Sequence, residues 1–156
     1  MNKISPIIDV EVSLREVTEE TVRQICSLSD TLSAQQQQMV APNAVSIAQA
    51  HFSDKAWFRA IYVDETPVGF LMLYDDVEKS EYYLWRLMIA GPYQKMGYGR
   101  RAIELLLEYV RARPGATELQ TNYVPIEGGP EMFYKGMGFV STGEVDGGEV
   151  VLSLKL

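Results

Sequence analysis

Residues 85–112 read WRLMIAGPYQKMGYGRRAIELLLEYVRA, and this stretch decides the fold. An apolar run ends in a turn that contains two glycines, and a strongly amphipathic segment follows the turn. The pattern predicts a strand, a glycine turn and a helix. The apolar stripe of that helix is predicted at Tyr98, Ala102, Leu105, Leu106 and Tyr109.

The start of the predicted helix is suited to binding a phosphate group. Main-chain N–H groups from Gly97 to Arg100 have no partner within the first helical turn, and the helix dipole favours an anion at this end. Gly97 and Gly99 carry no Cβ that would keep a ligand away from the main chain. Arg100 and Arg101 add positive charge. The turn therefore predicts an anion-binding site.

Length and composition predict one domain over residues 1–156. The chain is 47% hydrophobic and 22% charged, which suffices for one ordinary core. Its apolar runs stay well below the roughly 20 residues that span a membrane, and the N-terminus is too short in apolar residues for a secretory signal. We therefore expect a cytoplasmic protein without a membrane partner.

Two counts limit the chemistry of the site. The chain has one cysteine, Cys26, and one histidine, His51, so we expect no metal site built from thiolates or imidazoles. The net charge of −7 disfavours nucleic acid as a partner, because phosphate neutralisation by cationic side chains supplies most non-specific binding. The same charge favours a cationic small molecule.

Strands and helices alternate irregularly along the chain, which predicts a mixed α/β fold. Hydrophobic periodicity predicts strands at 10–15, 58–63, 68–74, 82–89, 119–123, 139–145 and 149–156. Besides the helix after the glycine turn, it predicts helices from Thr18 to Leu28, from Asn43 to His51 and from Pro130 to Met137.

Two motifs in this order resemble the GNAT superfamily of N-acetyltransferases. Residues 94–99, QKMGYG, match its acetyl-CoA signature Q/R-x-x-G-x-G/A, and residues 134–139, YKGMGF, resemble its Y-x-x-x-G-F segment. Within the superfamily, the chain is most similar to small bacterial spermine/spermidine acetyltransferases. The similarity lies in YLWRLMI at 83–89, PNAVSIAQA at 42–50 and GGPEMFYKGMGF at 128–139.

The resemblance implies a fold and a cosubstrate. It implies a mixed, mostly antiparallel twisted sheet of about seven strands with about four helices, and acetyl-CoA as cosubstrate. The strand before the glycine turn would separate from its neighbour, and the pantetheine arm would pair with Leu87, Met88 and Ile89. An N–H group near Met88 would then polarise the thioester carbonyl.

The resemblance also assigns the remaining cosubstrate contacts. The turn and the first helical residues would cover the pyrophosphate, and Asn122 on the facing strand would bind the pantetheine. The residues of the turn and the helix start are Gln94, Lys95, Met96, Gly97, Tyr98, Gly99, Arg100 and Arg101.

Acetyl transfer to an amine needs a base and an acid. The attacking amine must be neutral, and the departing thiolate needs a proton. The resemblance assigns the acid role to Tyr134, because a phenol with a pKa of about 10 is protonated at neutral pH. Without the resemblance, Tyr134 would be interpreted as an aromatic residue packed between helix and sheet.

The base does not follow from the resemblance. Some polyamine acetyltransferases carry a glutamate at the strand position that Trp85 occupies here, and Trp85 cannot accept a proton. Glu81 on the same strand is one candidate and Glu127 is another. An ordered water that relays the proton is a third. Arg86 is expected to pair with an acidic side chain on the sheet.

Several acceptors are compatible with the sequence. Asp75, Asp76, Glu78 and Glu81 are expected to line the acceptor mouth and to hold a polyamine. The alternatives are another amine, such as an aminoglycoside, an amino acid or a protein N-terminus, and a non-catalytic acetyl-CoA sensor. A more distant alternative is a dinucleotide-binding protein, because residues 97–102 fit G-x-G-x-x-A. The family also admits a homodimer.

Overall fold

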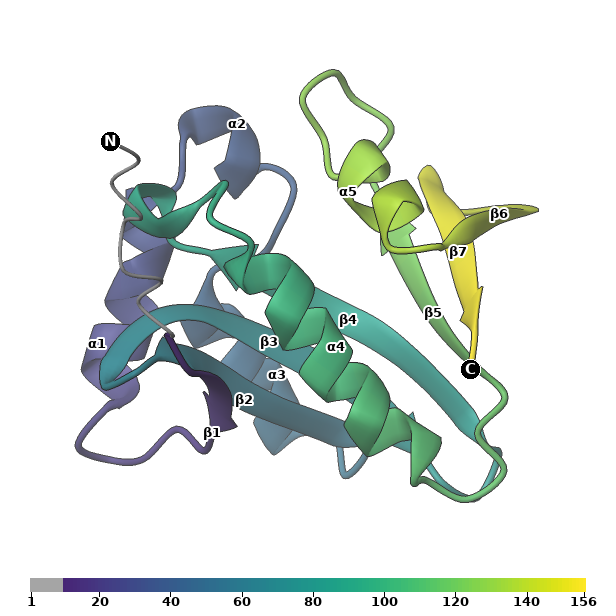
Figure 1. The fold of residues 1–156 in the computed structure, drawn as a ribbon, viewed down its shortest axis with the longest axis horizontal. Coiled ribbons are helices and arrows are strands. Elements are labelled where there is room, and N and C mark those ends of the chain that lie inside the picture. Colours follow the sequence, from purple (N-terminus) through teal and green to yellow (C-terminus); the bar gives the residue numbers. More distant parts are fainter. Residues whose placement is uncertain (1–9) are drawn as a thin grey trace, which may run out of the picture.

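The computed structural model describes residues 10–156, and a seven-stranded sheet in the order β1-β2-β3-β4-β5-β7-β6 runs through it (Figure 1). All neighbouring strands are antiparallel except β4 and β5. This arrangement confirms the predicted fold class. The strands are β1 (Val12–Arg15), β2 (Ala56–Val63), β3 (Thr66–Asp76), β4 (Glu81–Ile89), β5 (Glu118–Tyr123), β6 (Val140–Asp146) and β7 (Glu149–Lys155). The N-terminus is expected to be too short in apolar residues for a secretory signal. Most of that segment is residues 1–9, which lie outside the described residues.

Helices cover both faces of the sheet. Figure 1 shows α4 across one face and α1 and α3 on the other. The α-helices are α1 (Val22–Ser27), α2 (Ala34–Gln37), α3 (Asn43–His51), α4 (Tyr98–Arg111) and α5 (Glu131–Gly136). Two short 3₁₀ turns, η1 (Leu28–Thr31) and η2 (Gly91–Tyr93), complete the order.

The short helix α2 is absent from the predicted elements. It forms because Ser33 and Gln36 cap its N-terminus reciprocally. The Gln36 N–H donates to Ser33 Oγ at 3.2 Å, and the Ser33 N–H donates to Gln36 Oε1 at 3.1 Å. A serine followed three residues later by a glutamine is the sequence signal that predicts this cap.

The start of α1 differs from the prediction. Thr18 does not cap the helix, which begins at Val22 with Thr21 at the cap position. The Thr18 N–H donates to Thr21 Oγ1 at 2.9 Å, and the Thr21 N–H donates to the Thr18 carbonyl at 3.1 Å. These bonds close a separate turn before the helix, so Glu19 and Glu20 lie outside α1.

The apolar stripe of α4 is rotated relative to the prediction. Leu105 and Tyr109 are only half-buried, whereas Ile103 is fully buried against the sheet. Tyr109 stacks on Trp57 instead, with ring centroids 4.2 Å apart. The fully or nearly fully buried residues of α4 are Ala102, Ile103, Leu106, Leu107 and Val110. They fix α4, and with it the glycine turn, on the central strands.

The sheet opens between β4 and β5. The two strands pair only at Tyr83 with Gln120 and at Leu84 with Thr121. Beyond that point β4 continues to Ile89 without β5, and Thr121 Oγ1 donates to the Leu84 carbonyl at 3.2 Å, where the pairing ends. The structure thus has the strand separation that the resemblance implied.

Candidate active site

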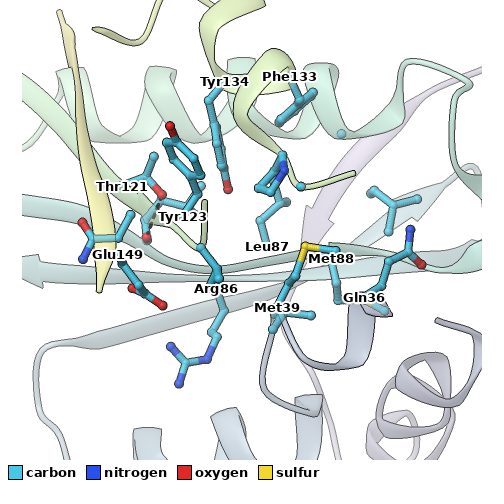
Figure 2. Close-up of a pocket in the computed structure, with 18 of the residues that line it drawn as sticks. Gln36, Met39, Arg86, Leu87, Met88, Thr121, Tyr123, Phe133, Tyr134 and Glu149 are labelled. Carbon is cyan, nitrogen blue, oxygen red and sulfur yellow. Dashed lines mark hydrogen bonds between the residues drawn. The ribbon is translucent and has the colours of Figure 1, made fainter. Parts of the chain in front are cut away.

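A cavity of about 1470 Å³ occupies the opening between β4 and β5. It is lined by α2 and the segment after it, by β4, by the loop from β4 to α4, by β5, by α5 and by the β6–β7 hairpin. Figure 2 shows Glu149 on one side of the cavity and Gln36 on the other, with Leu87 and Tyr134 between them. The cavity therefore joins the glycine turn to the edge of β4 and to the last hairpin.

The glycine turn presents free N–H groups to this cavity. Gly97 has φ +84 at the cap position of α4, and Lys95 is also left-handed, with φ +63. The first helical hydrogen bond runs from the Arg101 N–H to the Gly97 carbonyl at 3.1 Å. The N–H groups of Tyr98, Gly99 and Arg100 therefore point out of the helix end, where an anion is favoured.

The two glycines have different roles. Glycine is needed at Gly97 because φ +84 is a left-handed conformation, while an added Cβ would meet nothing within 4 Å. At Gly99 an added Cβ would contact the Phe133 ring at 3.5 Å, an ordinary van der Waals distance. The sequence suggests that access to the main chain requires glycine at both positions. In the structure, this access does not require glycine at both.

Most predicted cosubstrate residues of the loop line the cavity, and two do not. Met96 is 58% exposed and lies outside the lining, and Arg101 pairs with Glu104 at 3.2 Å. The Arg101 N–H is also committed to the helix. Met96 and Arg101 therefore lie outside the lining, and a cosubstrate contact of either residue stays a prediction. The predicted residues of the loop and helix start that line the cavity are Gln94, Lys95, Gly97, Tyr98, Gly99 and Arg100.

The edge of β4 offers main-chain groups from Leu87 and Ile89. The Ala90 N–H donates to the Val68 carbonyl at 2.8 Å, so this pair is hydrogen-bonded across β3 and β4. Bonded and non-bonded pairs alternate in antiparallel strands, so Met88 also bonds to β3, while Leu87 and Ile89 face the opening. Of the three predicted edge residues, Leu87 and Ile89 turn main-chain groups to the opening and Met88 does not, and a donor near Met88 stays a prediction.

A β-bulge at Trp85 changes the facing of β4. Leu84 pairs with Leu73 and Arg86 with Met72, so Trp85 is the extra residue. Before the bulge Leu84 packs in the core under α4, and after it Leu87 and Ile89 pack against that same core. Because of the bulge, Leu87 and Ile89 form the edge that borders the cavity. Strict alternation along the sequence does not predict this facing.

Tyr134 lies in the cavity wall. It reaches from α5 toward the opening and is 6% exposed (Figure 2). Burial raises the pKa of Tyr134 to about 12, while a hydrogen bond with the Thr121 side chain acts in the opposite direction. The phenol is therefore protonated at neutral pH, as a proton donor must be. Asn122 also lines the cavity from β5.

Neither glutamate that the sequence offers as a base reaches the cavity. Glu81 is exposed at the first position of β4, opposite Asp76, and does not line the cavity. Glu127 is exposed and also outside the lining, and its main-chain carbonyl accepts a bond from Gln35 Nε2 at 2.6 Å. Both residues therefore lie outside the lining, and a role of either as the base stays a prediction.

The acidic stretch after β3, Asp75, Asp76, Glu78 and Glu81, begins with the last two residues of that strand and does not line the cavity. Asp75 accepts from the Tyr109 hydroxyl at 2.7 Å and from Arg113 Nε at 3.0 Å. Asp76 is 2% exposed, accepts from Tyr74 at 3.2 Å and lies 3.6 Å from Lys55 Nζ. Such buried carboxylates are held by their partners and are unavailable to a substrate.

Acidic side chains reach the cavity from the β6–β7 hairpin instead. Glu144, Asp146 and Glu149 line it, on the side of Tyr83 and Arg86. Burial raises the pKa of Tyr83, Arg86 acts against that effect, and the negative charges of Glu81 and then Asp146 add to the rise. The sequence did not indicate these residues, because their approach depends on β7 pairing with β5 rather than on any local motif.

Arg86 points to the other side of β4 from Tyr134 (Figure 2). Its two terminal nitrogens donate to the Trp85 carbonyl at 3.0 Å and to Gln49 Oε1 at 3.1 Å. Its Nε is buried without a partner among residues 10–156. Burial lowers the pKa of Arg86, and Glu149 acts against that effect. Among residues 10–156, the expected ion pair of Arg86 with an acidic side chain does not form.

The part of the chain that the structure describes has neither a metal-binding cluster nor a membrane-spanning helix. In that part, the acidic, histidine and cysteine side chains form no group of three or more that could hold a metal ion. None of the helices between residues 10 and 156 is both long and apolar enough to cross a membrane.

Comparisons with known proteins agree with this geometry. The family model described as the acetyltransferase (GNAT) family matches residues 22–139. An acetyltransferase from Salmonella typhimurium that modifies the N-terminal serine of a ribosomal subunit protein superposes with a TM-score of 0.77 at 14% identity, over 93% of this chain and 95% of that one.

Two other solved structures are similar. An acetyltransferase from Thermus thermophilus has a TM-score of 0.73 at 16% identity, over 93% of this chain and 97% of that one. The PaiA N-acetyltransferase from Thermoplasma acidophilum, in complex with coenzyme A, has a TM-score of 0.69 at 15% identity, over 94% and 99%. At such identities the likeness concerns the fold. No curated protein matches the sequence.

Proposed function

Because the chain belongs to the acetyltransferase (GNAT) family, which makes it an acetyl-CoA-dependent N-acetyltransferase, we propose that its acceptor is a primary amine of a small cation. A polyamine such as spermidine or spermine is the preferred acceptor. The observation that carries the proposal is the placement of Glu144, Asp146 and Glu149 in the cavity wall. Carboxylates hold ammonium groups by charge-assisted hydrogen bonds.

The residues that line the cavity fit acetyl-CoA, which supplies the acetyl group as a thioester. The free N–H groups of Tyr98, Gly99 and Arg100 suit the pyrophosphate. The N–H groups of Leu87 and Ile89 on the open edge of β4 suit the pantetheine arm and the thioester carbonyl. The Ile89 carbonyl is already occupied by Gln94 Nε2 at 2.8 Å.

The reaction needs two proton transfers, and each takes place on a different side of the cavity. The acceptor ammonium enters on the acidic side and loses its proton through an ordered water to a carboxylate of that wall. Tyr134 donates a proton to the departing thiolate, so the phenol ends as the base form and recovers its proton from solvent. Thr121 lies beside Tyr134, and both side chains are buried at the end of the β4–β5 pairing.

Arg86 supports a second candidate acceptor. Its Nε lacks a partner and its side chain lines the same cavity as the acidic wall. A zwitterion, such as an amino acid or a peptide N-terminus, would place its ammonium near the carboxylates and a carboxylate or carbonyl oxygen near Arg86. A polyamine offers no acceptor for this nitrogen.

Release of free thiol from acetyl-CoA tests these acceptors directly. Purified protein is incubated with acetyl-CoA and, in separate reactions, spermidine, spermine, an aminoglycoside, free amino acids and short peptides. We expect polyamines to give the highest kcat/KM. Faster release with amino acids or peptides would favour the zwitterion. If thiol release with every amine stays at the level measured without amine, while acetyl-CoA still raises the Tm, the result would favour a non-catalytic acetyl-CoA sensor.

A further inference from the structure

The short helix α2 is held to the cosubstrate loop by a pair of side-chain amides. Gln36 Nε2 donates to Gln94 Oε1 at 3.0 Å, and Gln94 Nε2 donates back to Gln36 Oε1 at 3.3 Å. Gln94 Nε2 also donates to the Ile89 carbonyl on the edge of β4. The glutamine of the acetyl-CoA signature thus connects the loop, the open strand and α2.

A second hydrogen bond connects α2 to the opposite side of the cavity. Gln35 Nε2 donates to the Glu127 carbonyl, in the connection between β5 and α5, at 2.6 Å. Helix α2 is four residues long and has no buried residue. A helix of this length gains little stability by itself, so its position depends on such side-chain bonds.

The segment that follows α2 forms part of the cavity wall. Residues 36–41 all line the cavity, and Met39 lies beside Met88 in Figure 2. The position of this wall is therefore set partly by the loop that binds the pyrophosphate. The loop itself contains a left-handed non-glycine residue, Lys95, at φ +63, a conformation that a bound ligand can stabilise.

We propose that Gln36 is a positioning residue that couples α2 and the wall at residues 36–41 to the occupancy of the acetyl-CoA loop. When the pyrophosphate fixes the loop, Gln94 is fixed, and the amide pair fixes α2. The acceptor side of the cavity is then completed only after the cosubstrate has bound. This step rests on the function proposed above. The coupling is reciprocal, so a bound acceptor strengthens cosubstrate binding by the same factor.

Hydrogen–deuterium exchange with coenzyme A as the only ligand tests the coupling without an acceptor. Three proteins are compared: the parent, Gln36→Leu and a matched control, Gln38→Leu. The Gln38 side chain makes no hydrogen bond with any residue from 10 to 156. In the parent and the control, we expect coenzyme A to slow exchange in residues 33–41 by about tenfold.

In Gln36→Leu, coenzyme A should still bind by calorimetry, because the N–H groups of α4 are unchanged, but the slowing at residues 33–41 should be lost. Gln36→Glu should retain part of it, because a carboxylate still accepts from Ser33 and Gln94. Undiminished slowing in Gln36→Leu would overturn the coupling, as would a parent that binds coenzyme A without protection of residues 33–41. Failure of the parent to bind coenzyme A would overturn the proposed function as well.

Discussion

At the scale of single residues, the proposed proton donor is Tyr134, which is buried beside Thr121 at the end of the β4–β5 pairing. We expect Tyr134→Phe to lower kcat by about 100- to 10,000-fold, the range for removal of a general acid. The affinity for acetyl-CoA should stay within about twofold, because the main-chain contacts remain. Steady-state kinetics and calorimetry measure the two quantities, and unchanged turnover would remove Tyr134 from the mechanism.

The same burial predicts a loss of stability at high pH. The pKa of Tyr134 is about 12 when folded, against about 10 when unfolded. The folded state therefore holds its proton longer, and this contribution to stability is present below about pH 10 and is lost as pH rises toward 12. At pH about 11 the loss amounts to roughly 1.4 kcal/mol.

Urea unfolding at pH about 9 and about 11 measures this loss. Tyr134→Phe should lose less stability than the parent between the two pH values, because phenylalanine does not ionise. Tyr109, whose pKa is also raised to about 12 by burial and by Asp75, remains in both proteins and serves as the common background. Equal losses in the two proteins would show that Tyr134 is not held in its protonated form by the fold.

Acceptor recognition belongs to the residue scale as well. We expect Glu149→Gln to raise the KM for spermidine about two- to fivefold, the range for a partly exposed charge pair, with kcat less affected. Glu78→Gln is the matched control, because Glu78 is exposed and lies outside the cavity. A larger effect from Glu78 than from Glu149 would favour the acidic stretch after β3 and contradict the assignment to the last hairpin.

At the scale of elements, the glycine turn fixes the direction of α4. Gly97→Ala should destabilise the fold by about 1–2 kcal/mol, because alanine disfavours the left-handed conformation at φ +84. For a chain of this size, that corresponds to a fall in Tm of about 2–8 °C. Gly136→Ala is the control, since its added Cβ has open space and no positive φ. Equal Tm values for the two variants would mean that the turn tolerates alanine.

The elements also show why prediction from sequence succeeded in part. The glycine turn, α4 and the strands follow from local patterns, so their presence and order could be predicted. The bulge at Trp85, the rotation of the α4 stripe and the pairing of Gln36 with Gln94 depend on tertiary contacts. The sequence assigns Met88 to the open edge because it cannot show which β4 groups already bond to β3.

At the scale of the whole molecule, the site is assembled from segments far apart in the chain. The edge of β4, the N-terminus of α4, Tyr134 on α5 and the last hairpin meet because β5 leaves β4 and pairs with β7. The motif residues could be predicted, since each carries a local signal. The acidic wall of Glu144, Asp146 and Glu149 could not, because its place is set by the strand order.

The proposed cosubstrate site depends most on the main-chain N–H groups at the start of α4, and calorimetric titration of coenzyme A into two variants of Gly99 tests them. Gly99→Ala keeps the N–H, and its Cβ has room beside Phe133. Gly99→Pro removes the N–H at a first-turn position where proline is tolerated. We predict a Kd near that of the parent for alanine and one weakened about 10- to 100-fold for proline, as for a lost hydrogen bond to a charged group. Equal affinities, with equal Tm values for both variants, would show that the Gly99 N–H does not bind the pyrophosphate.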